Sequence, residues 1–290
     1  MKSATGKAPA PIMRGVPAVA AYLAGGVAAA IAAFLFAAAW PLLTSGHVTE
    51  TLTAPWRPFA AAPSFGIGAM VVASALIASG ATLIAFPVAL GLVAFLQGIG
   101  PQQLRRPLLR LVQFMTSIPT VVYGFVAVIV LVPAIRSALG GSGYSLLGAI
   151  VMLALLILPT IVLVWHAHLV QSESRVLTAC LALGLSPAQA LVQVMLPASR
   201  RGVVAALVLG FCRALGDTLI ALMVAGNATG VPHSLLDSAR ALTAHIALVM
   251  ATDAFSPEYR SVAGAACLLF LLTAGLSLGL RRLERTGESP

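Results

Sequence analysis

Long apolar runs, separated by short polar segments, dominate this chain. At 1.5 Å of rise per residue, a helix needs about 20 apolar residues to cross the roughly 30 Å hydrocarbon core of a bilayer. Runs of about this length occur at 16–43, 66–96, 111–135, 146–164, 203–224 and 262–280. The pattern predicts an all-α integral membrane fold of about six transmembrane helices, with a kink at Pro87 in the second.

Three of the intervening segments carry predictions of their own. The segment 47–64 contains three prolines and is expected to be irregular. In the segment 166–201 we predict two short helices, at 177–183 and 187–194, with a turn at Gly184 and an N-cap at Ser186. The segment 226–260 contains a helix-like piece at 235–250.

Composition points the same way. Hydrophobic residues make up 60% of the 290 residues and charged residues only 9%, whereas soluble domains carry about 25% charged residues. The chain is therefore expected to be surrounded by membrane lipid, and a water-soluble fold is excluded. The three cysteines have no paired spacing, so they predict neither a disulfide framework nor a zinc site.

The distribution of charge predicts the orientation. With both termini in the cytoplasm, the inner segments hold twelve lysines and arginines and the outer segments hold four. An excess of basic residues on the cytoplasmic side is the rule for multi-pass membrane proteins. The net charge of +9 is thus a topology signal and requires no nucleic-acid partner. Because the first apolar run is longer than the core of a secretory signal, we expect it to be retained as a helix.

The sequence argues against catalysis by this chain alone. Its only lysines are Lys2 and Lys7, so it contains no GxxxxGK[ST] phosphate-binding loop, and any ATPase is a separate polypeptide. His166 and His168 are two residues apart and face different sides of a helix, which does not favour a metal site. No arrangement typical of hydrolytic catalysis emerges. We expect neither enzyme activity nor a cofactor or metal in this chain.

Two charged residues lie inside the fifth predicted span. Arg213 follows Arg201 by twelve residues, or about 18 Å along a helix, which is near the middle of the bilayer. Asp217 follows one turn later on the same predicted helix face. Each such charge costs about 2.5–3.5 kcal/mol and normally faces a partner or an aqueous pathway. Two interpretations are open: an ion pair that only fixes helix packing, and an anion pathway with Arg213 as its guanidinium.

The anion-pathway interpretation leads to a hypothesis about selectivity. A guanidinium presents a planar fork of donors that suits tetrahedral oxyanions. An ionised carboxylate only accepts hydrogen bonds. Asp217 would accept one from the proton of hydrogen phosphate, a proton that sulfate lacks near neutral pH. Arg213 and Asp217 together would therefore favour phosphate over sulfate.

The segment between the fourth and fifth spans resembles the ATPase-docking loop of ABC importer permeases. That loop reads Glu-Ala-Ala, three residues, Gly, nine residues and Ile-x-Leu-Pro. Every spacing is matched here, by Thr178, Ala179, Cys180, Gly184, Val194, Leu196 and Pro197. Thr178 and Cys180 replace the family's Glu and Ala, so this chain has no acid at the position that the family's Glu would use to contact the ATPase, while Gly184, Leu196 and Pro197 preserve the turn.

Two further motifs resemble Pst-type phosphate permeases. One is similar to the family's IPSVVYG segment and contains Ser117, Pro119, Tyr123 and Gly124. The other, from Arg213 to Thr218, is similar to the family's RALGET, with Asp217 in place of Glu. The continuation to Asn227 resembles the C-type half, PstC, more than the A-type half, PstA. The resemblance covers about residues 65–280.

The resemblance implies the architecture of a type I (MetI-like) importer in the bacterial inner membrane. Such an importer has two permease halves, two ATPase subunits that carry ATP and Mg, and an external phosphate-binding protein. The second half would be PstA-like or another copy of this chain, and the segment 226–260 would meet the binding protein. In this chain, residues 1–64 would form the tail, first helix and outer loop. Residues 65–280 would form the permease core with the docking loop 166–201, and 281–290 a cytoplasmic tail.

Three alternative functions stay open. The first is an ABC permease for another oxyanion, such as sulfate or molybdate. The second is an ion-coupled secondary transporter that needs no ATPase, and the docking-loop spacing argues against it. The third is a membrane signalling scaffold that reports phosphate without moving it, and the charges inside the fifth span argue against that.

Overall fold

The computed structural model describes residues 11–44, 48–250 and 259–285. Its long helices are α1 (Pro11–Thr44), α3 (Gly68–Ala94), α4 (Gln102–Ser117), α7 (Leu146–Ala182), α10 (Arg200–Gly216) and α13 (Tyr259–Arg285). Its shorter helices are α2 (Val48–Thr53), α5 (Thr120–Val126), α6 (Val132–Leu139), α8 (Pro187–Gln189), α9 (Leu196–Ala198), α11 (Leu219–Val224) and α12 (Leu242–Val249). Three π-helical turns join them, namely η1 (Phe95–Ile99), η2 (Ala127–Leu131) and η3 (Ala190–Met195). The predicted helical membrane fold is confirmed.

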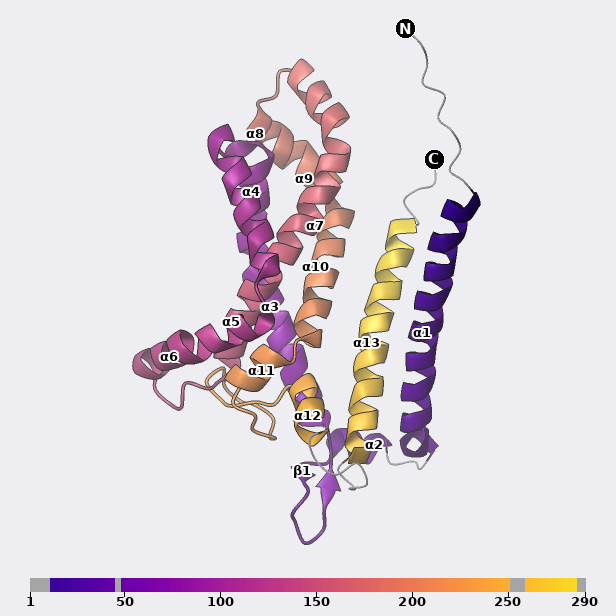
Figure 1. The fold of residues 1–290 in the computed structure, drawn as a ribbon. Coiled ribbons are helices and arrows are strands. Elements are labelled where there is room, and N and C mark those ends of the chain that lie inside the picture. The colour runs from indigo at the N-terminus through magenta and orange to yellow at the C-terminus, as the bar shows by residue number, and fades with distance from the viewer. Residues whose placement is uncertain (1–10, 45–47, 251–258, 286–290) are drawn as a thin grey trace.

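Most of the long helices run along a common direction (Figure 1), whereas α5 and α6 lie across it. By length and apolar composition, five helices of the described residues are long enough to cross a membrane. The number rises to six if Pro187–Ala198 and Arg200–Gly216, two helical segments bent by 68° relative to one another, form one span. The cytoplasmic-side segment around Gly184 lies at the same end of the molecule as the start of α1 and the end of α13.

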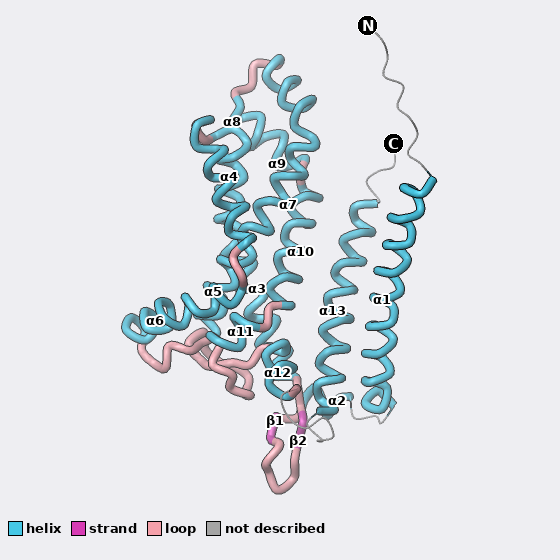
Figure 2. Tube along the Cα trace, in the orientation of Figure 1, coloured by secondary structure: helices cyan, strands magenta, loops and turns pink. Residues whose placement is uncertain are grey.

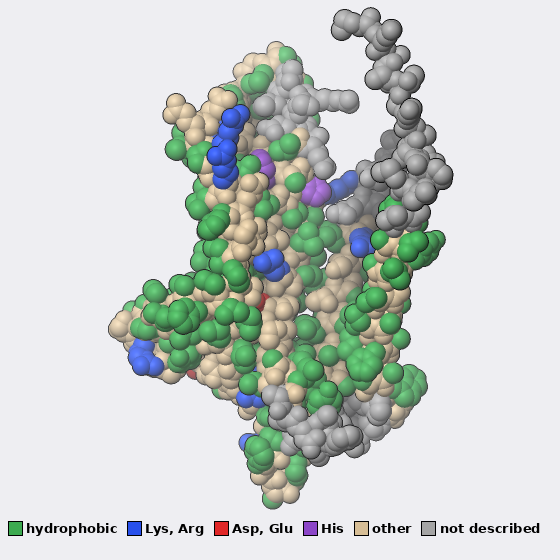
Figure 3. All heavy atoms as spheres, in the orientation of Figure 1, with side chains coloured by type: hydrophobic (Ala, Val, Ile, Leu, Met, Phe, Trp, Pro, Cys, Tyr) green, Lys and Arg blue, Asp and Glu red, His purple; other side chains and the backbone are tan. Residues whose placement is uncertain are grey.

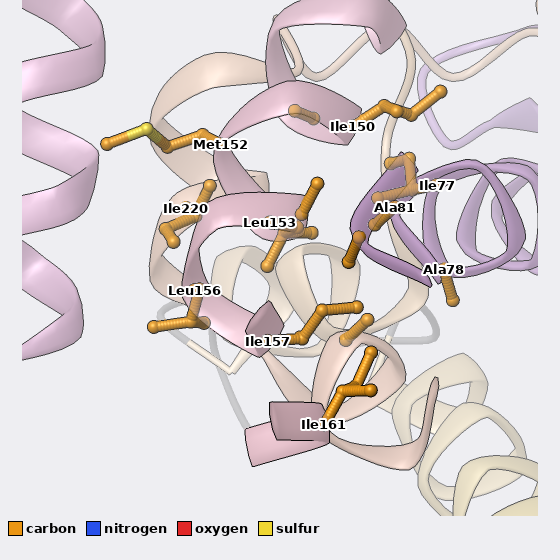
Figure 4. Packing of buried hydrophobic residues seen from close by; sticks show 14 of the residues in the cluster. Ile77, Ala78, Ala81, Ile150, Met152, Leu153, Leu156, Ile157, Ile161 and Ile220 are labelled. Carbon is orange, nitrogen blue, oxygen red and sulfur yellow. The ribbon is translucent and has the colours of Figure 1, made fainter. Parts of the chain in front are cut away.

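The core is formed where α3, α7 and α10 pack together. One face of α3 consists mainly of buried alanines, including Ala78 and Ala81, which are fully shielded. Small residues allow two helices to approach closely in lipid, where apolar burial adds little. Leu153 and Ile157 of α7 fill the space beside them (Figure 4), within one continuous apolar cluster. By contrast, α1 packs against α13 and is otherwise largely exposed.

Apolar side chains cover most of the length of the molecule, as expected for a surface in contact with lipid (Figure 3). Residues 166–201, which resemble the ATPase-docking loop, are called the docking segment from here on. Basic side chains form a column over α4 at the end of the molecule that carries this segment. The exposed Arg106 and Arg110 of α4 belong to this end. This distribution agrees with the predicted cytoplasmic position of that end.

The structure corrects the predicted bounds of several elements. The helix expected at 146–164 continues to Ala182, so the first helix predicted in the docking segment is only the last part of α7. The second is built from α8, η3 and α9. The piece expected at 235–250 is helical only in α12. Part of the segment 47–64 is regular, because α2 and strands β1 (Trp56–Arg57) and β2 (Ser64–Phe65) form within it.

The third and fifth predicted spans are not continuous helices. The third, expected at 111–135, is divided at Ile118 and Pro119, between α4 and α5, and the span that the structure offers instead runs from Thr120 to Leu139. The fifth, expected at 203–224, is interrupted at Asp217 and Thr218, between α10 and α11. These two interruptions define the candidate site.

Candidate functional site

The interruption after α10 is fixed by side chains on both sides. Asp217 has an extended backbone with a ψ of 128°, which ends the helix at Gly216. Its Oδ2 accepts a hydrogen bond from the backbone N–H of Ile220 at 2.9 Å, so the carboxylate caps the start of α11. Its carbonyl oxygen accepts a hydrogen bond from Thr243 Oγ1 at 2.8 Å. The chain therefore turns here in a defined way.

The interruption between α4 and α5 has a different cause. Ile118 and Pro119 both adopt extended backbone, with ψ values of 124° and 141°. Proline has no N–H to continue a helix and disfavours helical backbone in the residue before it. The hydroxyl of the buried Tyr123 donates to the carbonyl oxygen of Met115 at 3.0 Å, which ties the two helices together across the gap.

The two interrupted spans lie side by side. Helices α5 and α11, each of which follows an interruption, pack against one another. Gly124 makes this contact possible, because a Cβ at this position would lie 2.6 Å from Met223 Sδ. Helix ends inside a membrane bundle are a recurrent place for a transport site, since the irregular backbone offers polar groups to a solute.

Arg213 lies in the last turn of α10, directly before the interruption, and its side chain is exposed in this single chain. Its helix α10 packs against α7, which also packs against α5 and α11. The neighbouring Cys212 is half-buried. Arg213 therefore lies on the side of the site that is exposed in the single chain, which we call the open side.

Asp217, unlike the exposed Arg213, is buried. It is 9% exposed and is held by backbone groups of α11. Among the described residues, Arg213 and Asp217 form no ion pair. Asp217 is the C-cap residue of α10, so the helix ends between the two residues and the Asp217 carboxylate turns to the start of α11. Among the described residues, the arrangement leaves the Arg213 guanidinium exposed, while the Asp217 carboxylate shapes the turn of the chain.

The residues of the predicted phosphate-permease motifs are partly brought together. Ser117 ends α4 and is exposed beside the interruption, Pro119, Tyr123 and Gly124 lie at the start of α5, and Arg213 lies in the last turn of α10. Asn227 lies beyond the far end of α11 instead. It adopts a left-handed backbone with a φ of 63°, and its Nδ2 donates to the carbonyl oxygen of Leu222 at 2.7 Å. Asn227 therefore closes α11 and does not line the site.

The docking segment forms the predicted turn. Gly184 has a φ of +83°, a conformation that favours glycine, directly after the end of α7. Ser186 and Gln189 form a reciprocal capping box at the start of α8. Ala179 and Pro197 are exposed and Leu196 is half-buried, whereas the side chain of Thr178 lies outside the described residues. Leu191 and Met195 anchor the segment in the core.

The sequence interpretation missed several residues that support these features. Thr243 and Ser74 are the clearest, because Ser74 Oγ accepts a hydrogen bond from the N–H of Leu242 at 2.7 Å, next to Thr243. Ser74 and Leu242 are 168 positions apart, and no local pattern connects them. Leu183, whose side chain is 81% exposed at the docking turn, was detectable as an apolar residue beside a turn glycine.

Comparison with known proteins agrees with this geometry. Residues 90–285 match the family model described as binding-protein-dependent transport system inner membrane component. The chain therefore belongs to this family of transport permeases and is a multi-pass protein of the inner membrane. It is an ABC importer permease subunit.

Individual relatives place it more closely. The chain is 30% identical over 228 residues to the probable ABC transporter permease protein YqgH of Bacillus subtilis, an alignment that covers 78% of this chain and 74% of YqgH. It is 28% identical over 280 residues to the phosphate transport system permease protein PstC of Mesorhizobium japonicum, covering 90% and 84%. The predicted resemblance to Pst-type permeases, and to PstC in particular, is confirmed.

A solved structure supports the fold alone. An inward-facing structure of the MetNI methionine ABC transporter aligns with 76% of this chain and 94% of its own chain, with a TM-score of 0.56 and 18% identity. The predicted MetI-like architecture is thus confirmed.

Proposed function

We propose that this chain is the C-type permease half of an ATP-driven phosphate importer and forms one side of the translocation pathway. The observation that carries the proposal is the exposed Arg213 beside two interrupted spans. A guanidinium at this depth is unfavourable against lipid but suits an anion in an aqueous pathway. The PstC relatives support phosphate as that anion.

The open side of the site calls for a second permease half. Arg213 is exposed in the single chain, and the apolar residues of α5 beside it, such as Val122 and Phe125, are exposed as well. A second half, either PstA-like or another copy of this chain, would cover this surface and enclose the pathway. An exposed charge at this depth would otherwise face lipid.

Two further partners, an ATPase dimer and an external binding protein, would bind at opposite ends of the chain. An ATPase dimer, which binds ATP and Mg, would dock around the exposed Leu183, Gly184 and Pro197. The docking segment joins α7 to α10, and these two helices pack against one another and against α3. Rocking of the docking segment would therefore reach the site through α7 and α10. An external phosphate-binding protein would deliver the solute to the opposite end.

The buried position of Asp217 bears on selectivity. In this conformation its Oδ2 accepts a hydrogen bond from the Ile220 N–H and the side chain is 9% exposed, so the hypothesis that Asp217 accepts the proton of hydrogen phosphate requires the carboxylate to become more accessible during transport. The choice of phosphate over sulfate or molybdate rests on the PstC relatives. Another oxyanion is therefore the alternative that the experiment must separate.

The test is uptake by the assembled importer in proteoliposomes. ATP supplied on the side of the ATPase subunits should drive accumulation of radiolabelled phosphate, which the phosphate-binding protein delivers on the opposite side. Excess unlabelled sulfate or molybdate should not compete. Accumulation that follows a proton gradient without ATP, or that sulfate abolishes, would contradict the proposal.

A further inference from the structure

The outer end of the molecule carries a projecting hairpin. Strands β1 and β2 pair antiparallel, with Trp56 opposite Phe65 and Arg57 opposite Ser64. Figure 2 shows the two strands and their connecting turn beyond the ends of α1 and α13, on the side opposite the docking segment. We call residues 56–65 the outer hairpin. Its turn lies outside the level of the membrane-spanning helices.

The turn of the outer hairpin is apolar and exposed. It reads Pro-Phe-Ala-Ala-Ala-Pro over residues 58–63 and contains none of the glycine, asparagine or aspartate that solvated turns favour. Phe59 at its tip is 98% exposed, and Ala60, Ala61, Ala62 and Pro63 are exposed too. An aromatic side chain displayed in this way contributes nothing to the packing of the fold. It is of the kind that dominates binding at protein interfaces.

The base of the outer hairpin is firmly held. Ser64 Oγ donates to the carbonyl oxygen of Pro55 at 2.7 Å, and the rings of Trp56 and Phe65 meet edge to face with centroids 5.7 Å apart. Gly66 follows directly and lies so close to the carbonyl oxygen of Ala54 that no Cβ fits there. A rigid base presents the tip in a fixed orientation, which lowers the entropy cost of binding a partner.

The base also contacts the elements that shape the site. The ring of Trp56 meets the fully buried ring of His245 in α12 with centroids 4.4 Å apart, and His245 shares a hydrogen bond with Ser261 of α13 at 3.2 Å. Helix α12 is not one of the candidate spans. Burial, and secondly the charge of Arg240, lowers the pKa of His245 to about 4, so its ring is neutral at neutral pH. Thr243 of the same helix binds Asp217 at the interruption.

We propose that the tip of the outer hairpin, centred on Phe59 with Arg57 beside it, is a docking surface for the external solute-binding protein. The inference rests on the proposed function in assuming such a protein, a class of partner that the family's description names. The partner surface would present an apolar depression for Phe59 flanked by a carboxylate for the exposed Arg57. Lipid is the less suitable occupant, because the turn projects beyond the ends of the spans. Helix α12 connects this surface to the interruption at Asp217.

The test is photo-crosslinking in whole cells that carry the complete importer. p-Benzoylphenylalanine replaces Phe59 in one variant and Leu235 in another. Leu235 is 54% exposed and belongs to the segment 226–260, the other outer surface proposed for the binding protein. After irradiation, adducts of the full chain are isolated and the attached molecule is identified by mass spectrometry.

The expected result is an adduct between position 59 and a secreted solute-binding protein, with little or none at position 235. An adduct at 235 only, an adduct of position 59 with lipid or with a second copy of the chain, or no adduct at 59 would each overturn the inference. If the captured protein binds a solute other than phosphate, the docking inference stands and the proposed substrate is wrong.

A second variant gives a functional readout. Phe59→Ala should raise the concentration of loaded binding protein needed for half-maximal uptake by about tenfold, the loss typical of a central aromatic at an interface, with the maximal rate retained. Leu23→Ala, at a 65% exposed position in α1 outside either proposed docking surface, should leave both values unchanged. Equal effects of the two substitutions, or a loss of maximal rate alone in Phe59→Ala, would contradict docking at the tip.

Discussion

Arg213 and Asp217 are four residues apart, yet one is exposed and the other is buried with its Oδ2 2.9 Å from the N–H of Ile220. The helix ends between them, so their side chains serve different purposes. The carboxylate holds the chain in the turn that begins α11. The guanidinium remains on the open side of the two interrupted spans, where an anion can reach it.

Substitutions at Asp217 separate the capping role from a role in solute contact. Asparagine keeps an oxygen that accepts from the Ile220 N–H, so Asp217→Asn should retain uptake and the preference for phosphate over sulfate. Asp217→Ala removes the acceptor and should lower the free energy of unfolding by about 0.5–2 kcal/mol. Thermal unfolding in detergent and competitive uptake in proteoliposomes measure the two effects. Loss of phosphate preference in Asp217→Asn would restore a direct role for the carboxylate.

The close contact between α5 and α11 gives a second prediction. Gly124→Ala places a Cβ 2.6 Å from Met223 Sδ, and such overpacking costs about 1–3 kcal/mol. We expect lower thermal stability and reduced uptake. The double variant Gly124→Ala with Met223→Ala should recover much of the uptake, because the shortened side chain vacates the space.

A matched control for this contact is Gly91→Ala in α3. A Cβ at Gly91 meets no atom within 4 Å, so this substitution should be neutral or slightly stabilising. If Gly124→Ala behaves like Gly91→Ala, the packing of α5 on α11 is not required for transport.

A third prediction concerns the join between the docking segment and the spans. Gln97, in η1, is 5% exposed, and its Nε2 lies 3.0 Å from Nδ1 of His166 in α7. Helix α8 packs on η1, and Trp165 next to His166 donates to Ser199 Oγ at 3.1 Å. Gln97→Leu should leave ATP hydrolysis by the assembled importer largely intact while it lowers the phosphate moved per ATP.

Two further variants make this third test specific. Exchange of the two side chains, Gln97→His with His166→Gln, should recover part of the coupling because a donor and an acceptor again face one another. Gln103→Leu, at an exposed position in α4, should have no effect. A parallel fall of ATP hydrolysis and transport in Gln97→Leu, with less assembled complex, would indicate a purely structural role.

Particular residues show which features were accessible to sequence reasoning. The apolar runs predicted the spans because lipid imposes length and composition on a helix. The turn at Gly184 and the cap at Ser186 followed from local backbone chemistry. The end of α10 did not, since Gly216 and Asp217 lie within an otherwise apolar run. That end depends on Thr243, held in place through Ser74, and contacts between distant residues leave no local pattern.

The candidate site was found in part for the same reason. Arg213 was identifiable as a charge at mid-membrane depth, and Pro119 marks a helix interruption in any membrane span. The pairing of Arg213 with Asp217 assumed an unbroken helix, whereas α10 ends at Gly216 and the Asp217 carboxylate caps α11. Asn227 belongs to the same motif in sequence but closes the far end of α11.

The most direct test of the account is the water accessibility of position 213 in the assembled importer. The described cysteines are Cys180, Cys212 and Cys267. In a background with Cys180 and Cys267 replaced by serine, one variant keeps Cys212, which is half-buried. The other combines Cys212→Ser with Arg213→Cys. A charged, membrane-impermeant thiol reagent is applied to both.

An anion pathway predicts that the thiol at position 213 reacts many times faster than Cys212 and that phosphate with its binding protein slows the reaction. A thiol at position 213 that reacts no faster than Cys212 would show that Arg213 faces lipid or a dry helix contact. The account of transport given above would then be contradicted.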